Sequence, residues 1–298
     1  MKPGRGEPVG LRAWILTRGV VRGLFLHHAF DHAATMGFYF FLGIIPLLVF
    51  AASLVGSVVQ REGADAILRP LFRTMPKVAS DLFRHEFHRL PDGYAPTLAP
   101  LSALGFLWLT TNGVHNLMDV FEMLVQARPR PWWRQRLVSI VWVVVGVAGL
   151  VAMTWLVLLI DGAAIEPPSH QLPPLLREAG GLLIRGWHHA GALVVCIAVA
   201  AGALATFYRS SVIHPRGVRR RVWAGTIVAL VLWGLVSWGF GTYVKAIADY
   251  AVYYGSLAAV AVILLWLYLT SLSLLVGAEV NAHLEGMRVP SGEAMVRE

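Results

Sequence analysis

Six long apolar segments, separated by short segments rich in arginine, constrain the fold of this chain more than any other feature. About 20 apolar residues cross the ~30 Å hydrocarbon core of a bilayer as a helix, and backbone amides in lipid must bond within their own segment. We therefore expect an all-α, polytopic membrane protein with six transmembrane helices. The expected spans are Thr35–Val59, Leu98–Val125, Leu137–Ile160, His189–Tyr208, Val222–Val244 and Ser256–Val280.

The composition supports a lipid environment for most of the chain. Hydrophobic residues make up 57% of the 298 residues and charged residues 14%, whereas charged residues make up about 25% of a soluble domain. Six helices with their loops account for this length, so we expect no separate soluble domain of ordinary size. The single cysteine, Cys196, excludes an intrachain disulfide and any metal site made of several cysteines.

Residues 1–34 are expected to form a cytoplasmic N-terminal segment. Apolar residues recur at helical spacing within Leu11–Phe30, but Arg12, Arg18 and Arg22 interrupt them. That pattern predicts an amphipathic helix lying on the membrane surface. It lacks the uninterrupted apolar region of a cleavable signal.

The six spans lie in a transmembrane domain of residues 35–282, and residues 283–298 are expected to form a cytoplasmic tail. The first outer loop runs from Gln60 to Thr97, and its apolar residues at helical spacing predict one or two short helices. Pro46 lies within the first span. Its missing backbone N–H predicts a kink there.

Small residues in the later spans are expected to mark helix packing faces, because they let backbones approach closely in lipid. Gly191 and Gly202 lie in the fourth span, and Gly234 and Gly241 lie along one side of the fifth.

Basic residues predict the orientation of the spans. Cytoplasmic loops of membrane proteins collect lysine and arginine, and most of the 25 basic residues fall on the side that holds both termini. The first outer loop is also basic, but it is longer and mixes in acidic residues. We expect the inner arginines to set the topology, or to attract anionic headgroups of the inner leaflet at about 1 kcal/mol each. The densest group is Arg128, Arg130, Arg134, Arg136, Arg209, Arg216, Arg219, Arg220 and Arg221.

The second span carries a polar stripe on one helical face. Its members are Asn112, His115, Asn116, Asp119 and Glu122. A charge at mid-span costs about 2.5–3.5 kcal/mol on insertion scales, so the stripe should face the bundle interior or a wet cavity. Two interpretations stay open: a substrate or proton path that opens to the cytoplasm, or a polar seam between helices.

Ionisable residues also lie at the ends of the last and first spans. Glu279 ends the sixth span one turn before His283, where it could line a substrate path or anchor the helix to an arginine such as Arg209. His28 and His32 have the i, i+4 spacing of metal ligands. Without a third ligand we interpret them as interfacial histidines and expect no metal or other cofactor.

Motifs of common catalytic sites are missing from the sequence. It contains no G-x-x-x-x-G-K-[ST] phosphate-binding loop and no H-E-x-x-H zinc motif. It also contains no G-x-S-x-G nucleophile motif. We therefore name no catalytic residue and do not expect an enzyme.

The most specific sequence pattern lies between Trp223 and Ala282. It consists of Ala248-Asp249-Tyr250, Tyr254-Gly255-Ser256-Leu257-Ala258-Ala259, Leu264-Leu265-Trp266-Leu267-Tyr268-Leu269 and Gly277-Ala278-Glu279-Val280-Asn281-Ala282. Weaker matches are Phe38-Tyr39 with Ile45-Pro46-Leu47, and Pro131-Trp132-Trp133-Arg134-Gln135-Arg136. In these residues the chain resembles the YihY/BrkB family of bacterial inner-membrane proteins. It departs from the family in the more polar stretch from Thr110 to Asn116.

The resemblance implies a six-helix protein of the bacterial inner membrane. Members of that family are linked to virulence and to envelope-lipid movement, and an older label calls them ribonuclease BN. We expect a transporter or translocator of lipid or small solute that acts in envelope maintenance; the alternative is a non-transporting scaffold or assembly partner. Ribonuclease activity is not expected, because the H-x-H-x-D-H pattern of tRNA-processing metallo-hydrolases is absent. Membrane lipids are the expected partners, nucleic acid is not, and a homo-oligomer is left open.

Overall fold

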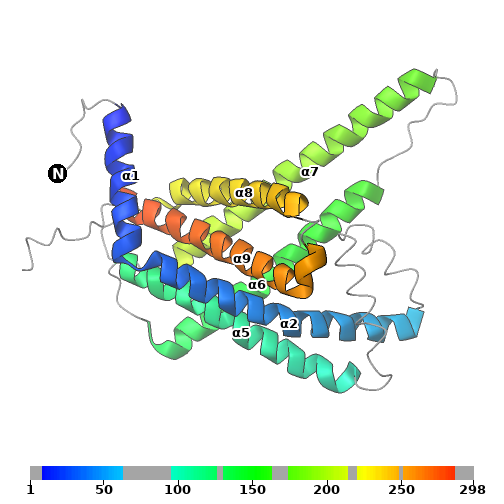
Figure 1. The fold of residues 1–298 in the computed structure, drawn as a ribbon, viewed down its shortest axis with the longest axis horizontal. Helices are drawn as coiled ribbons and strands as arrows, with labels where there is room; N and C mark the ends of the chain where they lie inside the picture. Colours follow the sequence, from blue (N-terminus) through cyan, green and yellow to red (C-terminus); the bar gives the residue numbers. More distant parts are fainter. Residues whose placement is uncertain are drawn as a thin grey trace, which may run out of the picture. The chain divides into compact units, whose positions relative to one another are not determined.

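A computed structural model describes residues 9–62, 95–125, 130–162, 174–213, 220–247 and 251–285. Every regular element in these ranges is an α-helix, which agrees with the expected all-α class (Figure 1). The helices are α1 (Val9–Leu26), α2 (Ala29–Glu62), α5 (Ala95–Val125), α6 (Trp132–Gly162), α7 (Pro174–Ser210), α8 (Val222–Ile247) and α9 (Ala251–Leu284). Of the first outer loop, residues 63–94 lie outside the described residues.

Five helices of the described chain are long and apolar enough to cross a membrane. The candidate spans are Ala29–Ser53, Trp132–Leu156, Ala190–Ser210, Val222–Val244 and Ala259–Leu284. They overlap the first, third, fourth, fifth and sixth expected spans. Helix α5 has the length of a span, at 31 residues, but it is not among the five. That α5 is the remaining transmembrane helix stays a prediction.

The described helices belong to two compact units. The first unit consists of Met1–Ile45, Gly105–Trp142 and Leu204–Glu298, and the second consists of Pro46–Leu104 and Val143–Ala203. Helices α1, α8 and α9 therefore lie in the first unit, together with parts of α2, α5, α6 and α7. The ionisable residues discussed below all belong to the first unit.

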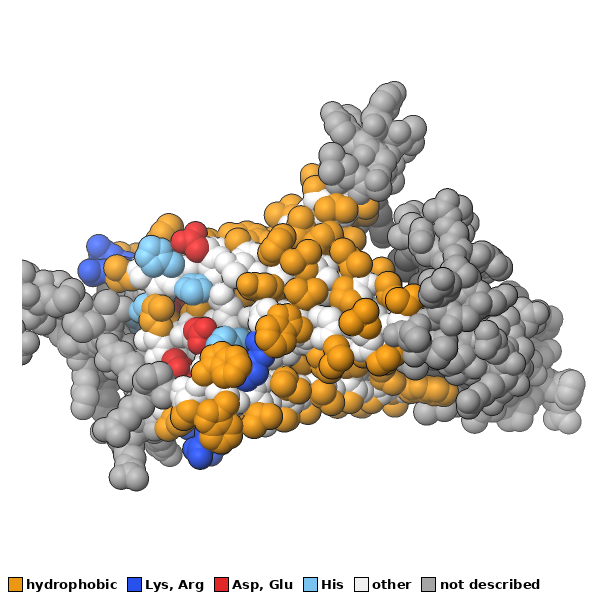
Figure 2. All heavy atoms as spheres, turned by 90° about the horizontal axis from the view of Figure 1, so that it is seen from below, with side chains coloured by type: hydrophobic (Ala, Val, Ile, Leu, Met, Phe, Trp, Pro, Cys, Tyr) orange, Lys and Arg blue, Asp and Glu red, His pale blue; other side chains and the backbone are white. Residues whose placement is uncertain are grey.

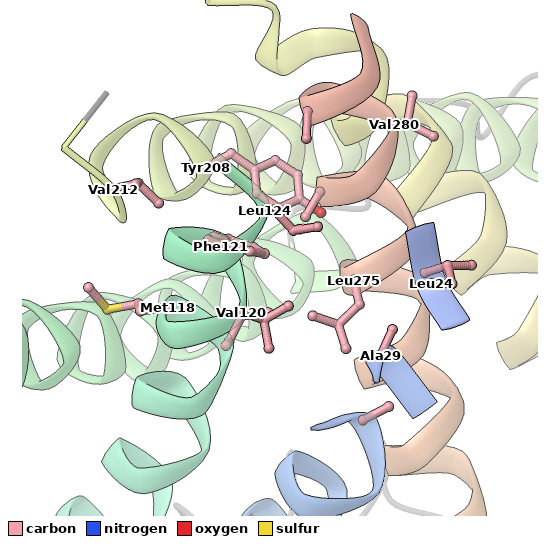
Figure 3. Close-up of a cluster of buried hydrophobic side chains, with 14 of the residues drawn as sticks. Leu24, Ala29, Met118, Val120, Phe121, Leu124, Tyr208, Val212, Leu275 and Val280 are labelled. Atoms are coloured by element: carbon pink, nitrogen blue, oxygen red, sulfur yellow. The ribbon is translucent and has the colours of Figure 1, made fainter. Parts of the chain in front are cut away.

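A hydrophobic core joins the helices of the first unit. Leu24 of α1 and Ala29 of α2 are buried in it. Figure 3 shows Val120 of α5 and Leu275 of α9 directed toward one another within this cluster. The ring of Phe121 lies 5.3 Å from that of Tyr208 in α7. These contacts hold α1 against one end of the helices of the first unit.

The turn between α1 and α2 explains why α2 begins six residues before the expected start of the first span. His28 has a φ of 51°, in the left-handed region, which ends α1. Its carbonyl then accepts the backbone N–H groups of Asp31 and His32, both at 3.1 Å, so α2 starts at Ala29. Figure 1 shows that α1 consequently runs across the ends of α2 and α9.

Helices α8 and α9 meet at two glycines. A Cβ atom at Gly277 would lie only 2.5 Å from the carbonyl oxygen of Gly225, so the backbones approach too closely for any side chain. The Gly225 N–H donates to Asn281 Oδ1 at 2.7 Å. This hydrogen bond ties the first turn of α8 to α9.

Of the small residues expected to mark packing faces, Ala205 is buried and Ser237 accepts a hydrogen bond from Trp266 Nε1 of α9 at 3.3 Å, but for four glycines the expectation was wrong among the described residues. Added Cβ atoms at Gly191, Gly202, Gly234 and Gly241 would meet no heavy atom within 4 Å. Helix α7 runs unbroken from Pro174 to Ser210, through the whole of the fourth expected span. Pro46 lies inside α2, and the kink expected there stays a prediction.

Candidate functional site

The polar stripe of α5 makes hydrogen bonds to α6, beginning with its first member. Arg136 Nη1 donates to Asn112 Oδ1 at 2.6 Å. The guanidinium of Arg136 also stacks on the ring of Trp108, with Cζ 4.3 Å from the ring centroid. Because Trp108 and Asn112 are one helical turn apart on α5, a single arginine holds both.

The middle of the stripe contacts both α2 and α6. His32 Nδ1 lies 2.8 Å from Asn116 Oδ1, and Gln135 Nε2 donates to Asp119 Oδ1 at 2.6 Å. His115 Nε2 lies 3.9 Å from the other carboxylate oxygen of Asp119. The Asp119 side chain keeps 49% of its surface exposed, so it combines a helix–helix contact with access from outside the protein.

The last member of the stripe, Glu122, is partly buried. Its Oε1 is enclosed and has no hydrogen-bond partner among the described residues. The backbone N–H of Arg130 donates to its carboxylate, and the guanidinium charge of Arg130 attracts it. Such contacts are expected for an acidic group near the first basic loop. Arg128 lies outside the described residues.

Two of the inner arginines bind the C-terminal end of α7. Arg130 Nη2 donates to the carbonyl of Ser210 at 2.7 Å, and Arg220 Nη1 donates to the carbonyl of Arg209. Cations are favourable there, because the last carbonyls of a helix carry partial negative charge. Burial lowers the pKa of Arg220, and the charges of Arg209 and Arg130 lower it further, while Glu285 raises it.

The other expected arginines have separate places. Arg134 stacks on Trp133, with Cζ 5.0 Å from the ring centroid, and the backbone N–H of Arg221 donates to Glu285 Oε1 at 2.8 Å. Arg216 and Arg219 lie outside the described residues.

Glu279 is the most deeply buried acidic group of the described chain, with 4% of its side chain exposed. Its Oε2 lies 3.3 Å from His27 Nδ1, and its Oε1 lies 4.0 Å from His283 Nδ1, one turn later on α9. The structure therefore places two imidazoles beside this carboxylate, and not Arg209. The Glu279 carboxylate, 3.3 Å away, raises the pKa of His27 despite its burial.

Two glycines of α1 make room for this cluster, which we call the Glu279 cluster (Glu279, His27 and His283). A Cβ atom at Gly23 would lie 2.5 Å from Cδ of Glu279 and would overlap Oε1, and one at Gly19 would overlap the His283 ring. The sequence interpretation passed over both glycines and treated the neighbouring histidines as interfacial. The available signal was the G-x-x-x-G spacing, which marks close helix contacts.

Ionisable side chains gather at one end of the molecular surface. Figure 2 shows histidine and acidic side chains at the end toward α1, and mainly hydrophobic side chains over the adjoining described surface. Exposed apolar residues such as Trp155, Leu193 and Trp238 are those expected to face lipid. Within the described ranges, no three His, Cys, Asp or Glu residues are grouped to hold a metal ion.

A cavity of about 30 Å³ lies between the C-terminal ends of α5, α7 and α9 and the N-terminal end of α8. Phe121, Leu124, Tyr208, Asn281 and Glu285 are among the residues that line it. This is about the volume of one water molecule, whereas ligand pockets usually measure about 300–1,000 Å³. In the described conformation the cavity can hold a water, and it does not reach the polar stripe.

Comparison with known proteins gives consistent matches along the chain. The profile of a family described as virulence factor BrkB matches residues 20–296. A UPF0761 membrane protein of Halorhodospira halophila is 26% identical over 305 residues, which cover 99% of this chain and 61% of the relative. A UPF0761 membrane protein of Xanthomonas campestris is 26% identical over 278 residues, which cover 88% and 60%.

This chain thus spans about three-fifths of the length of these two UPF0761 relatives. A Bacillus subtilis protein named as ribonuclease-like, YfkH, is 26% identical over 271 residues, which cover 87% of this chain and 91% of YfkH. No solved structure matches the chain.

Proposed function

This chain belongs to the virulence factor BrkB family, and we propose that it is a translocator that moves a lipid or a small solute across the bacterial inner membrane. The observation that carries the proposal is the buried Glu279 in a candidate span, beside two histidines. An ionisable group within a transmembrane segment is costly and usually marks a path for a substrate, an ion or a proton. A purely structural contact at this position could be made by apolar residues of similar volume at lower cost.

The arrangement of arginines supports an anionic cargo or lipid contact on the inner side. Both termini are proposed to be cytoplasmic, together with the loops that contain Arg130 and Arg220. Basic residues near the inner leaflet attract anionic headgroups. Envelope maintenance is the proposed physiological role, with membrane lipids as partners.

The polar stripe of α5 favours a second candidate function. Asn112, Asn116 and Asp119 each have a partner on a neighbouring helix, and the described cavity measures only about 30 Å³. A helix bundle with partnered polar groups suits a scaffold or assembly partner that transports nothing. For the translocator, the same contacts must open during transport, and Asp119 is the exposed member from which opening would begin.

Ribonuclease activity is not part of the proposal, although YfkH carries a ribonuclease-like name. The sequence His27-His28-Ala29-Phe30-Asp31-His32 lacks the second histidine of H-x-H-x-D-H, because Ala29 stands in its place. His27, Asp31 and His32 also have separate partners, in Glu279, His28 and Asn116. We propose that the protein is not an enzyme.

The translocator proposal is tested with purified protein in liposomes. Transfer of fluorescent phosphatidylglycerol, fluorescent phosphatidylethanolamine and a set of labelled solutes is measured for the unmodified protein, Glu279→Gln and Asp119→Asn. Asp31→Asn is the matched control, since Asp31 is 81% exposed and contacts only His28 among the contacts described for its side chain. The proposal expects protein-dependent transfer of at least one probe that falls in both test variants and not in the control.

The scaffold is favoured instead if no probe moves in any sample while a stable envelope partner co-purifies. Unchanged transfer in both Glu279→Gln and Asp119→Asn, with normal folding, would remove these residues from the path.

A further inference from the structure

The Glu279 cluster lies at the contact between two helices and is enclosed by both. Helix α1 covers it with Gly19 and Gly23, whose missing side chains leave room for the His283 ring and the Glu279 carboxylate. The histidine from the α1–α2 turn approaches the same carboxylate at 3.3 Å. The carboxylate is therefore closed off from solvent only while α1 stays docked on α9.

The charges around Glu279 explain what holds α1 in place. His27 faces it from the turn after α1, and His283 faces it from its own helix. Helix α8 also packs on α9, where Gly225 lies against Gly277 and Asn281. Arg18 and Arg22 of α1 are exposed. The side chains described beside Glu279 are both imidazoles, so protonated imidazole is the cation that the described contacts offer to the buried carboxylate.

We propose that the Glu279 cluster is a proton-binding site whose occupancy controls the docking of α1 on α9. With a proton on the cluster, His27 carries a positive charge, the carboxylate is paired and α1 covers it. Without that proton, a buried carboxylate faces neutral imidazoles, which is unfavourable. Helix α1 then separates from α9, and water reaches Glu279.

The direction of the pH response follows from the raised pKa of His27. Docking is strongest below the ordinary histidine pKa of about 6.5, and it weakens as the pH rises through the raised value. The inference extends the proposed translocator, since the same Glu279 carries that proposal. Its test needs no transported substrate, so its failure would leave the transport experiment to be judged separately.

The test measures how accessible the docked face of α1 is to a thiol reagent. Cys196, the single cysteine, is replaced by alanine, and a cysteine is introduced by Val20→Cys, at a position with 7% exposure in the core. The reference protein carries Val21→Cys instead, on the 46% exposed outer face of the same helix. The ratio of the two maleimide labelling rates removes the intrinsic effect of pH on a thiol.

We expect this ratio, measured in lipid nanodiscs, to rise severalfold from pH 5.5 to pH 8.5, because docking weakens as His27 loses its proton. Glu279→Gln and the double variant His27→Gln/His283→Gln should each abolish the rise. The matched control, His28→Gln, alters a 74% exposed histidine of the same turn and should keep it.

A ratio that does not change with pH would overturn the proposal, as would a rise that persists in Glu279→Gln or in the double variant. Hydrogen exchange of the α1 amides, corrected for intrinsic rates and followed in protein without introduced cysteines, provides the second measurement if Val20→Cys does not fold. It should show protection that decreases with pH in the unmodified protein and not in Glu279→Gln. Equal pH responses of these two proteins would refute the proton site independently.

Discussion

Replacing Gly225 by alanine should strongly destabilise the contact between α8 and α9. The new Cβ atom would overlap the carbonyl oxygen of Gly277 and lie 2.5 Å from Cγ of Asn281. The first of these is a backbone atom, so rotation of a side chain cannot relieve the overlap. The helices must move apart, and the hydrogen bond from the Gly225 N–H to Asn281 Oδ1 lengthens with them.

The size of the effect follows from these two losses. Forcing an additional methyl group into a packed contact costs about 1–3 kcal/mol. A weakened buried hydrogen bond adds about 0.5–1.5 kcal/mol. The expected destabilisation is therefore about 1.5–4.5 kcal/mol, less the small gain in helix propensity from replacing glycine with alanine.

Two other glycines provide a graded control in the same assay. Gly234 lies on the same helix with no heavy atom within 4 Å of an added Cβ, so Gly234→Ala should stabilise by about 0.5–1 kcal/mol. At Gly37 an added Cβ would lie 3.0 Å from the backbone nitrogen of Tyr268, so Gly37→Ala should fall between the two. Unfolding by SDS in mixed micelles, followed by circular dichroism, measures all three. Equal stabilities of Gly225→Ala and Gly234→Ala would refute the assigned α8–α9 contact.

Three further changes have defined outcomes. Tyr208→Phe removes a hydroxyl that donates to the carbonyl of Leu274 at 2.7 Å and should cost about 0.5–1.5 kcal/mol in the same unfolding assay; no loss would mean that this bond does not form. Arg136→Lys keeps the charge but loses stacking on Trp108, so it should destabilise by about 0.5–2 kcal/mol, whereas a neutral result would place that arginine in solvent. Because the pKa of His27 is raised in the folded protein, its contribution to stability should be present at pH 5.5 and decline as the pH rises above about 6.5. His27→Gln should flatten that part of the pH–stability curve, and an unchanged slope would contradict the assigned histidine–carboxylate pair.

Some contacts of the α5 stripe could be anticipated, and others could not. The spacing from Asn112 to Glu122 places these residues on one helical face, and a polar face in an apolar chain must meet other polar groups. Their partners are His32, Gln135 and Arg136, which lie 16 to 84 residues away along the sequence. Local periodicity carries no information about such distant pairs.

Closely packed and open glycines also could not be told apart from the sequence. Gly225 and Gly277 let two backbones approach closely, whereas added Cβ atoms at Gly234 and Gly241 would meet no atom of the described residues within 4 Å. All four lie in apolar helices, and a residue without a side chain leaves no hydrophobic pattern by which packed and open positions could be told apart. Only the helix crossing distinguishes them.

The sequence by itself determined that this chain is helical and membrane-embedded, because the lengths of apolar segments are set by the thickness of hydrocarbon and by the need to satisfy backbone amides locally. The tertiary structure decided what surrounds Glu279. An i, i+4 spacing brings His283 to it along α9, but His27 arrives from the other end of the chain. His27 reaches Glu279 because His28 turns the backbone and because two glycines let α1 lie against α9. The contact between His27 and Glu279 therefore depends on packing between segments that are neighbours in space and not in the sequence.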